Sequence, residues 1–189
     1  MSRDIPSRAS LRAELRARRR ALSKGERHFA ARRFARNLRR ILPPGRRRHV
    51  ALYLARDGEL DPLPALIEAS PSRLYLPVLD PIHRGRLQFL PWRPHDPLQA
   101  NRYGIGEPRQ QYGGRAAWTL DVILMPLVAF DDRGHRLGMG GGFYDRTLAD
   151  LARRPRRPTL IGVAYGFQRL PRVPTAQWDQ PVDQVITDE

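Results

Sequence analysis

DVILMPLVAF, residues Asp121–Phe130, is a nearly continuous run of apolar residues. It lacks the alternation of polar and apolar residues that a half-exposed strand would show. A strand of this kind is typical of a parallel sheet that is covered on both faces. We therefore expect this segment to be the central strand of the fold.

Shorter apolar runs lie on both sides of this segment and alternate with helical patterns. The predicted strands are His49–Leu54, Arg73–Val78, Leu87–Trp92, Thr159–Tyr165 and Gln184–Thr187. The predicted helices between them are Pro62–Ala69 and Gly142–Arg153. This alternation predicts an α/β fold with a mainly parallel sheet.

The N-terminal region, from Ser7 to about Leu42, has apolar residues at helical spacing. Ser23 and Glu26 have the spacing of a capping box, so we expect one helix to end and a second to begin there. Prolines at positions 43 and 44 end the second helix. The chain thus begins with a predicted helical pair over about residues 7–42.

Length and composition limit the class of protein. The 189 residues suffice for one ordinary domain, so we expect residues 1–189 to form a single domain. No run of 18 apolar residues and no signal peptide is present, which excludes membrane and secreted classes. With no cysteine there is neither a disulfide framework nor a thiolate nucleophile. We expect a cytoplasmic protein.

The positive charge is concentrated in one part of the chain. Residues 1–48 carry 17 basic and three acidic residues, which accounts for +14 of the total charge of +15. Such a region attracts anions such as nucleotides, nucleic acids or polycarboxylates. The chain has a single lysine, Lys24, so a coding preference for arginine is an equal explanation of the excess.

A glycine-rich loop follows the predicted central strand. Four of the five residues from Gly138 to Gly142 are glycine, with Arg136 and Arg146 on either side. Such a loop exposes backbone N–H groups to phosphate oxygens at the carboxyl edge of the sheet, where α/β proteins bind ligands. The spacing is not that of a Walker A loop. A flexible strand-to-helix turn is the alternative.

Several polar residues near this edge are candidates with a structural alternative. Asp145 is a potential Mg²⁺ ligand or a first-turn acid that offsets the helix dipole. Asp179 and Asp183 are most simply surface acids of a loop. Glu59 follows the first strand, and Tyr103 offers a ring for stacking or for the core. No metal-ligand spacing of histidines and no Ser-His-Asp arrangement is evident.

The chain resembles the 5-formyltetrahydrofolate cyclo-ligase family from about Arg8 to about Thr187. The most specific segment is RLGMGGGFYDR (Arg136–Arg146), which is similar to the family signature R-L-G-x-G-x-G-Y-Y-D. Other similar segments are SRASLRAELRARRRALS, LYLARDGELD, LYLPVL, NRYGIGEP, DVILMPLVAFD, LIGVAY and WDQPVDQVIT. The resemblance implies a three-layer α/β/α, Rossmann-like fold with the arginine-rich helical pair packed on it.

The resemblance also implies a reaction of folate one-carbon metabolism. In this family 5-formyltetrahydrofolate and ATP yield 5,10-methenyltetrahydrofolate, ADP and phosphate, with Mg²⁺ as the cofactor. The formyl oxygen is phosphorylated and N10 then attacks the activated carbon. Phosphoryl transfer needs positioning and charge neutralisation rather than a protein nucleophile.

Site residues are carried over from the family position by position. The implied catalytic residues are Arg136, Tyr144 and Asp145, and the implied Mg²⁺ ligands are Asp145 and Asp179. The implied ATP contacts are Arg8, Arg12, Arg136, Leu137, Gly138, Met139, Gly140, Gly141, Gly142, Phe143 and Tyr144. The implied folate contacts are Leu54, Glu59, Tyr103 and the loop from Arg136 to Gly140. The departures are that Phe143 replaces a tyrosine, Arg8 replaces a lysine, and Met139 and Gly141 replace basic residues of some members.

Two other functions remain to be tested against this one. A nucleic-acid-binding protein would use the helical arginines and would not need the glycine loop. A nucleotide sensor would use the loop without turnover. The resemblance favours the ligase, so we expect ATP and 5-formyltetrahydrofolate as partners, and neither nucleic acid nor a membrane.

Overall fold

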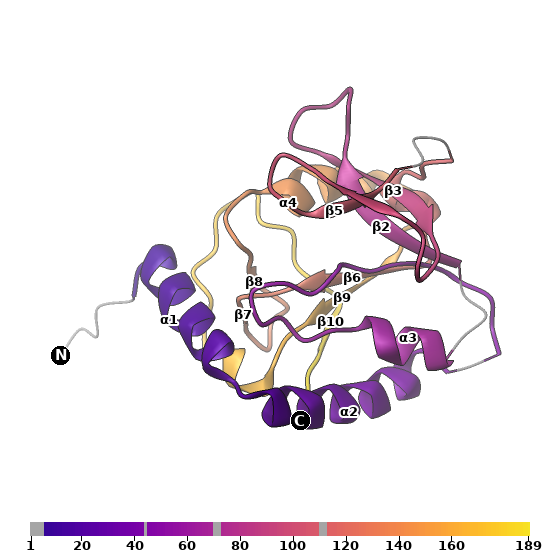
Figure 1. Cartoon of the computed structure of the whole chain (residues 1–189). Coiled ribbons are helices and arrows are strands. Elements are labelled where there is room, and N and C mark those ends of the chain that lie inside the picture. The colour runs from indigo at the N-terminus through magenta and orange to yellow at the C-terminus, as the bar shows by residue number, and fades with distance from the viewer. Residues whose placement is uncertain (1–5, 44, 70–72, 110–112) are drawn as a thin grey trace.

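A six-stranded sheet organises the molecule (Figure 1). The computed structural model describes residues 6–43, 45–69, 73–109 and 113–189. The strands follow the order β10–β9–β6–β1–β2–β3, and neighbours are parallel except for the antiparallel pair β2–β3. Their bounds are β1 His49–Ala51, β2 Arg73–Leu79, β3 Leu87–Trp92, β6 Val122–Pro126, β9 Thr159–Val163 and β10 Gln184–Ile186.

Strand β6 lies inside the sheet, between β1 and β9, as its apolar sequence predicts. Ile123, Leu124 and Met125 have no exposed surface, so both faces of the strand are covered. The rest of the apolar run is not part of this strand, and the predicted single strand to Phe130 is wrong. The run continues as β7 (Ala129–Phe130), which pairs with β8 (Arg136–Leu137) in a separate two-stranded sheet.

The chain leaves the sheet at Leu127, where side chains donate hydrogen bonds to backbone carbonyl oxygens that a neighbouring strand would otherwise bind. Gln168 donates from Nε2 to the carbonyl oxygens of Leu127 and Val128, both at 2.8 Å. Arg19 donates from Nη1 to the Leu127 oxygen at 3.4 Å. The two side chains thus replace a neighbouring strand and let β7 turn toward β8.

Helices cover both faces of the sheet, which confirms the three-layer α/β/α prediction. Figure 1 shows α2 (Lys24–Ile41) and α3 (Leu63–Ala69) on one side of the sheet and α4 (Phe143–Leu148) on the other. Alternate residues of β6 serve the two layers, as the pleat requires. Leu124 joins the core under α2 and α3, whereas Met125 packs with Leu148 and Leu151 under α4.

The predicted N-terminal helical pair is confirmed. It consists of α1 (Arg8–Ala21) and α2, and the capping box at their junction is formed. The amide of Glu26 donates to Ser23 Oγ at 3.2 Å, and Glu26 Oε2 accepts from the Ser23 amide at 2.8 Å. Helix α1 lies at the side of the sheet and packs Leu11 and Leu15 against the β7–β8 region.

Several other predicted boundaries differ from the structure. The predicted helix Gly142–Arg153 is two short elements, α4 and the 3-10 turn η2 (Leu151–Arg153), because the backbone leaves the helix at Asp150 with φ −91° and ψ 0°. The predicted strands that start at His49, Thr159 and Gln184 each end one to three residues early. The hairpin β4–β5 (Leu98–Ala100, Gly106–Pro108) and the 3-10 turns η1 (Ala117–Thr119) and η3 (Gly166–Gln168) were not predicted.

In the ranges that the structure describes, no helix combines the length and the apolar character that a membrane span requires.

Candidate active site

The glycine loop connects β8 to α4 and has the conformation that its composition predicts. Gly140 has φ +98° and Gly142 has φ +64°, values that residues with a Cβ rarely adopt. Arg12 of α1 donates from Nε to the carbonyl oxygen of Gly138 at 2.8 Å. The guanidinium of Arg12 also lies beside Gly140, where an added Cβ would be 3.5 Å from Arg12 Cζ. Helix α1 therefore holds one side of the loop.

Arg136 lies beneath the loop and is almost fully buried, with 6% of its surface exposed. Its Nη2 donates to Asp145 Oδ1 at 2.7 Å, and the same oxygen accepts from the backbone amide of Gln180 at 3.1 Å. Arg136 Nε is buried and has no hydrogen-bond partner within the described part of the chain. An unpaired buried donor is costly, so this atom is suited to an anionic ligand.

Asp179 lies in the C-terminal segment and binds the first helix. Arg8 donates to it with two nitrogens, from Nη1 at 2.7 Å and from Nη2 at 3.2 Å, and the Ala176 amide donates at 2.8 Å. Burial alone would raise the pKa of Asp179, but the hydrogen bonds from Arg8 and Ala176 outweigh it and lower the pKa. Burial and the nearby charge of Arg8 lower the pKa of Arg12.

The two acids expected to bind Mg²⁺ are thus brought to one place. Asp145 accepts from the amide of Gln180, the residue after Asp179, and Arg136 is close enough to lower the pKa of Asp179. Within the described ranges no cluster of three or more acidic or histidine side chains offers a complete cation site. Mg²⁺ commonly binds one or two carboxylates together with substrate phosphates. The pair fits Mg²⁺ if phosphates complete the coordination.

Helix α4, which follows the glycine loop, is short. The helix has six residues, fewer than two turns. A helix of this length contributes little dipole, so an anion at the loop would depend mainly on arginine side chains and backbone N–H groups.

Two side chains of the site come from different elements. Tyr144 lies in α4, and Glu59 lies in the segment that follows β1. Burial raises the pKa of Tyr144 above its usual value, and the charges that act on its hydroxyl are those of Arg136 and Glu59. Tyr144 therefore stays a neutral hydrogen-bond donor. Burial also raises the pKa of Glu59, whose Oε2 accepts from the Arg56 amide at 3.0 Å. Leu54 is half-buried nearby, with its Cδ1 facing Gly106.

Tyr103 lies across from the glycine loop, in the turn between β4 and β5. Its ring meets Phe143 edge to face, with the ring centroids 5.7 Å apart, and 52% of its surface is exposed. The two rings line a hollow of about 500 Å³ together with Arg84, Arg102 and Arg146. Arg56 Nη1 donates to the carbonyl oxygen of Gly104, which ties this turn to the segment that carries Glu59. The structure thus brings the predicted ATP and folate contacts to one region.

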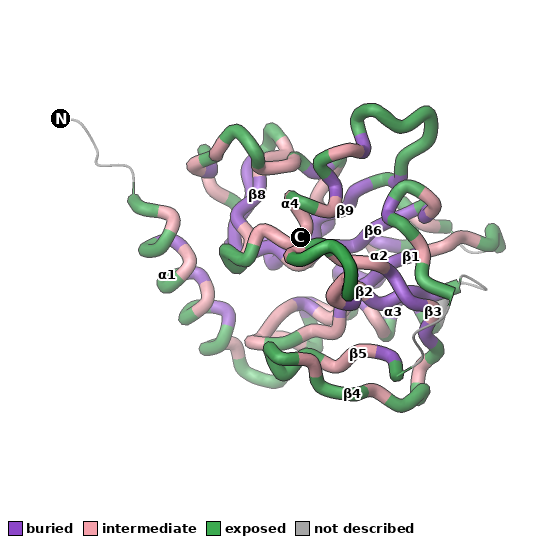
Figure 2. Tube along the Cα trace, turned by 90° about the horizontal axis from the view of Figure 1, so that it is seen from above, coloured by how far each residue is buried: buried purple, intermediate pink, exposed green. Residues whose placement is uncertain are grey.

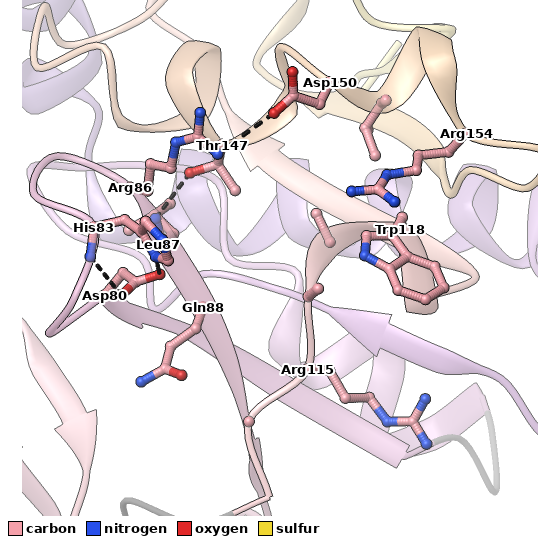
Figure 3. A pocket seen from close by; sticks show the side chains of 14 residues that line it. Asp80, His83, Arg86, Leu87, Gln88, Arg115, Trp118, Thr147, Asp150 and Arg154 are labelled. Atoms are coloured by element: carbon pink, nitrogen blue, oxygen red, sulfur yellow. Dashed lines mark hydrogen bonds and ion pairs between the residues drawn. The ribbon is translucent and has the colours of Figure 1, made fainter.

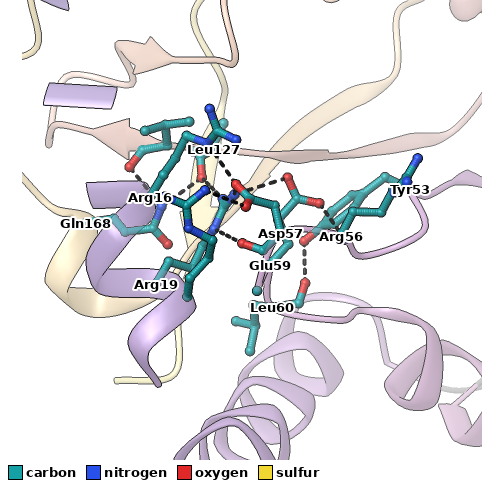
Figure 4. A network of polar contacts seen from close by, with 12 residues as sticks. Arg16, Arg19, Tyr53, Arg56, Asp57, Glu59, Leu60, Leu127 and Gln168 are labelled. Atoms are coloured by element: carbon teal, nitrogen blue, oxygen red, sulfur yellow. Dashed lines mark hydrogen bonds and ion pairs between the residues drawn. The ribbon is translucent and has the colours of Figure 1, made fainter. Parts of the chain in front are cut away.

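A polar network around Arg19 was not predicted (Figure 4). Arg19 is 1% exposed and donates to Asp57 twice, from Nε to the carbonyl oxygen and from Nη2 to Oδ2, both at 2.9 Å. Its Nη2 is also 3.7 Å from Glu59 Oε1. A signal for it exists in the sequence, because Arg19 continues the four-residue spacing of Leu11 and Leu15. The three residues form the buried stripe of α1, which Figure 2 shows in purple.

All six arginines of α1 are used within the protein. Besides Arg8, Arg12 and Arg19, Arg16 donates to Asp57 Oδ2 at 2.7 Å and Arg20 pairs with Asp57 Oδ1 at 3.3 Å. The sixth, Arg18, lies over the ring of Phe167, 4.3 Å from its centroid. The basic character of this helix therefore has an intramolecular explanation.

Replacing Arg19 with methionine is expected to lower the free energy of unfolding by about 3 kcal/mol, because Asp57 and the largely buried Glu59 lose the buried cation that they share. Arg20→Met is the matched control: it pairs with the same Asp57 but is 54% exposed, so its loss should cost less than about 1 kcal/mol. Urea unfolding measures both. Equal losses for the two variants would contradict the assigned role of Arg19.

Known proteins match this chain over nearly its whole length. The model of the 5-formyltetrahydrofolate cyclo-ligase family matches residues 4–188. A 5-formyltetrahydrofolate cyclo-ligase of Escherichia coli (strain K12) is 39% identical over 176 residues, which is 92% of this chain and 96% of the relative. One from Haemophilus influenzae is 36% identical over 183 residues, covering 95% and 96%.

Solved structures of similar proteins have the same fold. The 5,10-methenyltetrahydrofolate synthetase of Aquifex aeolicus superposes with a TM-score of 0.77 at 31% identity, covering 96% of this chain and 90% of that one. The corresponding enzyme of Mycoplasma pneumoniae superposes with a TM-score of 0.75 at 25% identity, covering 97% of this chain and 100% of that one.

Proposed function

The chain belongs to the 5-formyltetrahydrofolate cyclo-ligase family and is an enzyme of that class, and we propose that it uses ATP to close the folate ring, in the cytoplasm. The proposed products are 5,10-methenyltetrahydrofolate, ADP and phosphate. The formyl group on N5 is an amide, and its oxygen is a poor leaving group. Transfer of the γ-phosphoryl group to that oxygen converts it into one that departs as phosphate.

The proposed reaction has two steps. The formyl oxygen attacks the γ-phosphorus and the bond to the ADP oxygen breaks. N10 then attacks the activated formyl carbon, loses its proton, and phosphate leaves with the former formyl oxygen. Neither step needs a nucleophile from the protein, so the task of the protein is to position the substrates and neutralise charge.

The observation that carries this proposal is the convergence of charged groups on the glycine loop. Arg12 and Arg136 flank the loop, Arg8 is held beside them by Asp179, and Asp145 pairs with Arg136. Cations around a loop with exposed backbone N–H groups suit the phosphates of ATP. The buried Nε of Arg136 supplies a donor for them.

Other residues have roles that follow from their surroundings. Tyr144 keeps its proton and can donate a hydrogen bond to the oxygen on which charge develops. Asp145 and Asp179 would hold Mg²⁺, which when bound neutralises phosphate charge. Glu59 can accept hydrogen bonds from the N–H groups of the folate ring. Leu54 and Tyr103 offer apolar surface for that ring.

The test is a spectrophotometric assay of the purified chain with 5-formyltetrahydrofolate, with and without MgATP. We expect absorbance of the methenyl product to rise only when MgATP is present, with one ADP formed per product. ATP binding without product would indicate a sensor. Product formation without ATP would contradict the proposed mechanism.

Arg8→Ala and Arg12→Ala are each expected to raise the KM for ATP about tenfold or more, since a charge-assisted hydrogen bond contributes about 1–3 kcal/mol. Arg157→Ala is the matched control, because Arg157 forms a similar two-nitrogen pair with Asp183, at 2.9 and 2.6 Å, away from the loop. Steady-state kinetics measure the effect. Unchanged KM together with tight, salt-dependent RNA or DNA binding would favour the nucleic-acid function instead.

A further inference from the structure

The side chain of Arg146 joins the glycine loop to a turn that is distant in sequence. It leaves α4 and donates from Nε to the carbonyl oxygen of Gly85 at 2.8 Å. Its Nη2 donates to the carbonyl oxygen of Gly141 at 2.6 Å. Gly85 lies in the turn between β2 and β3. One guanidinium therefore bridges the backbones of two separate segments.

Two glycines make room for this guanidinium. An added Cβ at Gly85 would be 2.6 Å from Arg146 Nε, and one at Gly142 would be 2.7 Å from Arg146 Nη1. Both glycines have positive φ, +80° and +64°. The ring of Phe143 lies under the guanidinium, 5.4 Å from ring centroid to Cζ. The positive φ values and the position of the Arg146 guanidinium both favour glycine at positions 85 and 142.

Further contacts join α4 and the residues after it to the start of β3 and the residue before it (Figure 3). Thr147 Oγ1 accepts from the Leu87 amide at 2.8 Å, and Arg86 Nη1 is 3.5 Å from Asp150 Oδ2.

The turn is itself well braced. Asp80 Oδ1 accepts from the amides of Ile82 at 2.8 Å and His83 at 2.9 Å, and the Asp80 amide donates to the Arg86 carbonyl oxygen at 3.0 Å. The turn is therefore a firm support on which Arg146 can fix the glycine loop.

The bond to Gly141 sets the orientation of one peptide in the loop. In a trans peptide the carbonyl and the following N–H point in opposite directions. A carbonyl of Gly141 held toward Arg146 therefore directs the N–H of Gly142 to the other side of the peptide. Fixing this N–H in advance lowers the cost of binding an anion there.

We propose that Arg146 is a positioning residue for the nucleotide: by bridging Gly85 and Gly141 it fixes the glycine loop in the form that binds the phosphates of ATP. This inference rests on the proposed function. Arg146 acts here through the loop, because two sides of its guanidinium are occupied by backbone carbonyls. A direct phosphate contact by the Arg146 charge is the competing role that the experiment must separate.

Three variants test the proposal by steady-state kinetics with ATP and folate varied separately. Arg146→Ala removes the bridge. Arg146→Lys keeps the charge but cannot make both bonds, because a single ammonium lacks the planar fork. Gly85→Ala displaces the guanidinium from a segment that precedes the loop by more than 50 residues. Each should raise the KM for ATP about tenfold to a hundredfold and leave the KM for folate unchanged.

The double variant Gly85→Ala/Arg146→Ala should be no worse than Arg146→Ala alone, since both changes break the same bridge. Gly113→Ala is the matched control for strain. It has φ +82°, close to that of Gly85, and an added Cβ there would be 3.7 Å from Pro91, an ordinary contact. We expect this control to lose some thermal stability and to keep the wild-type KM for ATP.

A second measurement does not depend on turnover. Hydrogen–deuterium exchange of residues 138–142 without nucleotide should be faster in Arg146→Ala and Gly85→Ala than in the wild type and in Gly113→Ala. Rescue by Arg146→Lys, or a normal KM for ATP in Gly85→Ala, would overturn the bridge in favour of direct charge contact. A rise in the KM for folate alone would overturn it as well. If the wild type forms no product with ATP, the proposed function fails, whereas the exchange result still decides whether the bridge orders the loop.

Discussion

Asp145→Asn is expected to lower kcat about a hundredfold or more, and Asp179→Asn is expected to do the same. Both changes remove a negative charge from the pair that would hold Mg²⁺ beside the phosphates, and charge stabilisation by a metal is worth several kcal/mol. Each 1.36 kcal/mol is a factor of ten in rate. Asparagine has the shape of aspartate, so its oxygen can still accept from Arg136 or Arg8, and the fold should survive.

Measurements of kcat at increasing Mg²⁺ concentration distinguish this role from a purely structural one. A weakened metal site should be partly rescued by excess Mg²⁺. Asp183→Asn is the matched control: it also breaks a two-oxygen pair with an arginine, Arg157, but it lies where β9 and β10 begin, at the opposite edge of the sheet. It should lose stability and keep its kcat. Wild-type kcat in Asp145→Asn or Asp179→Asn would remove that residue from the metal site.

Gly140→Ala is expected to abolish turnover or to raise the KM for ATP about a hundredfold. At φ +98° an alanine is strained by about 1–3 kcal/mol, and the chain can relieve this strain by changing the loop. Space is not the obstacle, because the added Cβ would make only ordinary contacts with Arg12, at 3.5 Å or more. A shift of about 1 Å in the loop N–H groups is enough for a loss of this size.

Gly45→Ala separates strain from loss of the site. Gly45 has φ +96°, almost the value of Gly140, and an added Cβ would have no neighbour within 4 Å. The two variants should lose similar thermal stability, but only Gly140→Ala should lose the heat of MgATP binding in calorimetry. If Gly140→Ala binds MgATP and turns over like the wild type, the loop is only a turn and the nucleotide binds elsewhere. Met139→Leu, at a half-exposed position of the same loop, should be nearly silent.

The parts of the fold that could be predicted depend on local signals. The capping box at Ser23 and Glu26 is satisfied within four residues, so the sequence marks the junction of α1 and α2 correctly. The apolar residues of β6 likewise predict that both faces of this strand are buried. The break at Leu127 depends on side chains 41 and 108 residues away, Gln168 and Arg19, and no local pattern contains them. The positions of Leu148 and Leu151 fit one long helix as well as the two short elements observed.

The candidate site also has parts that the local sequence predicts and parts that depend on residues distant in the chain. The composition predicts the glycine loop and its positive φ angles, because four glycines in five residues are seldom needed unless the backbone adopts such angles. The approach of Arg8 to Asp179 crosses 171 residues, so only the resemblance to a family could link them. The sequence shows Arg146 as a charge beside the loop, but its contact with Gly85, 61 positions away, depends on the fold. The burial of Arg19 does not follow from its residue type, because arginine is rarely buried unless it is paired, although its spacing places it on the apolar stripe.

The pairing of Arg8 with Asp179 also has a consequence for biosynthesis. Helix α1 emerges early from the ribosome. Asp179, which binds Arg8 in the first turn of α1, is made only 171 residues after Arg8. During synthesis, the proposed nucleotide site therefore stays incomplete until Asp179 has emerged and can hold Arg8.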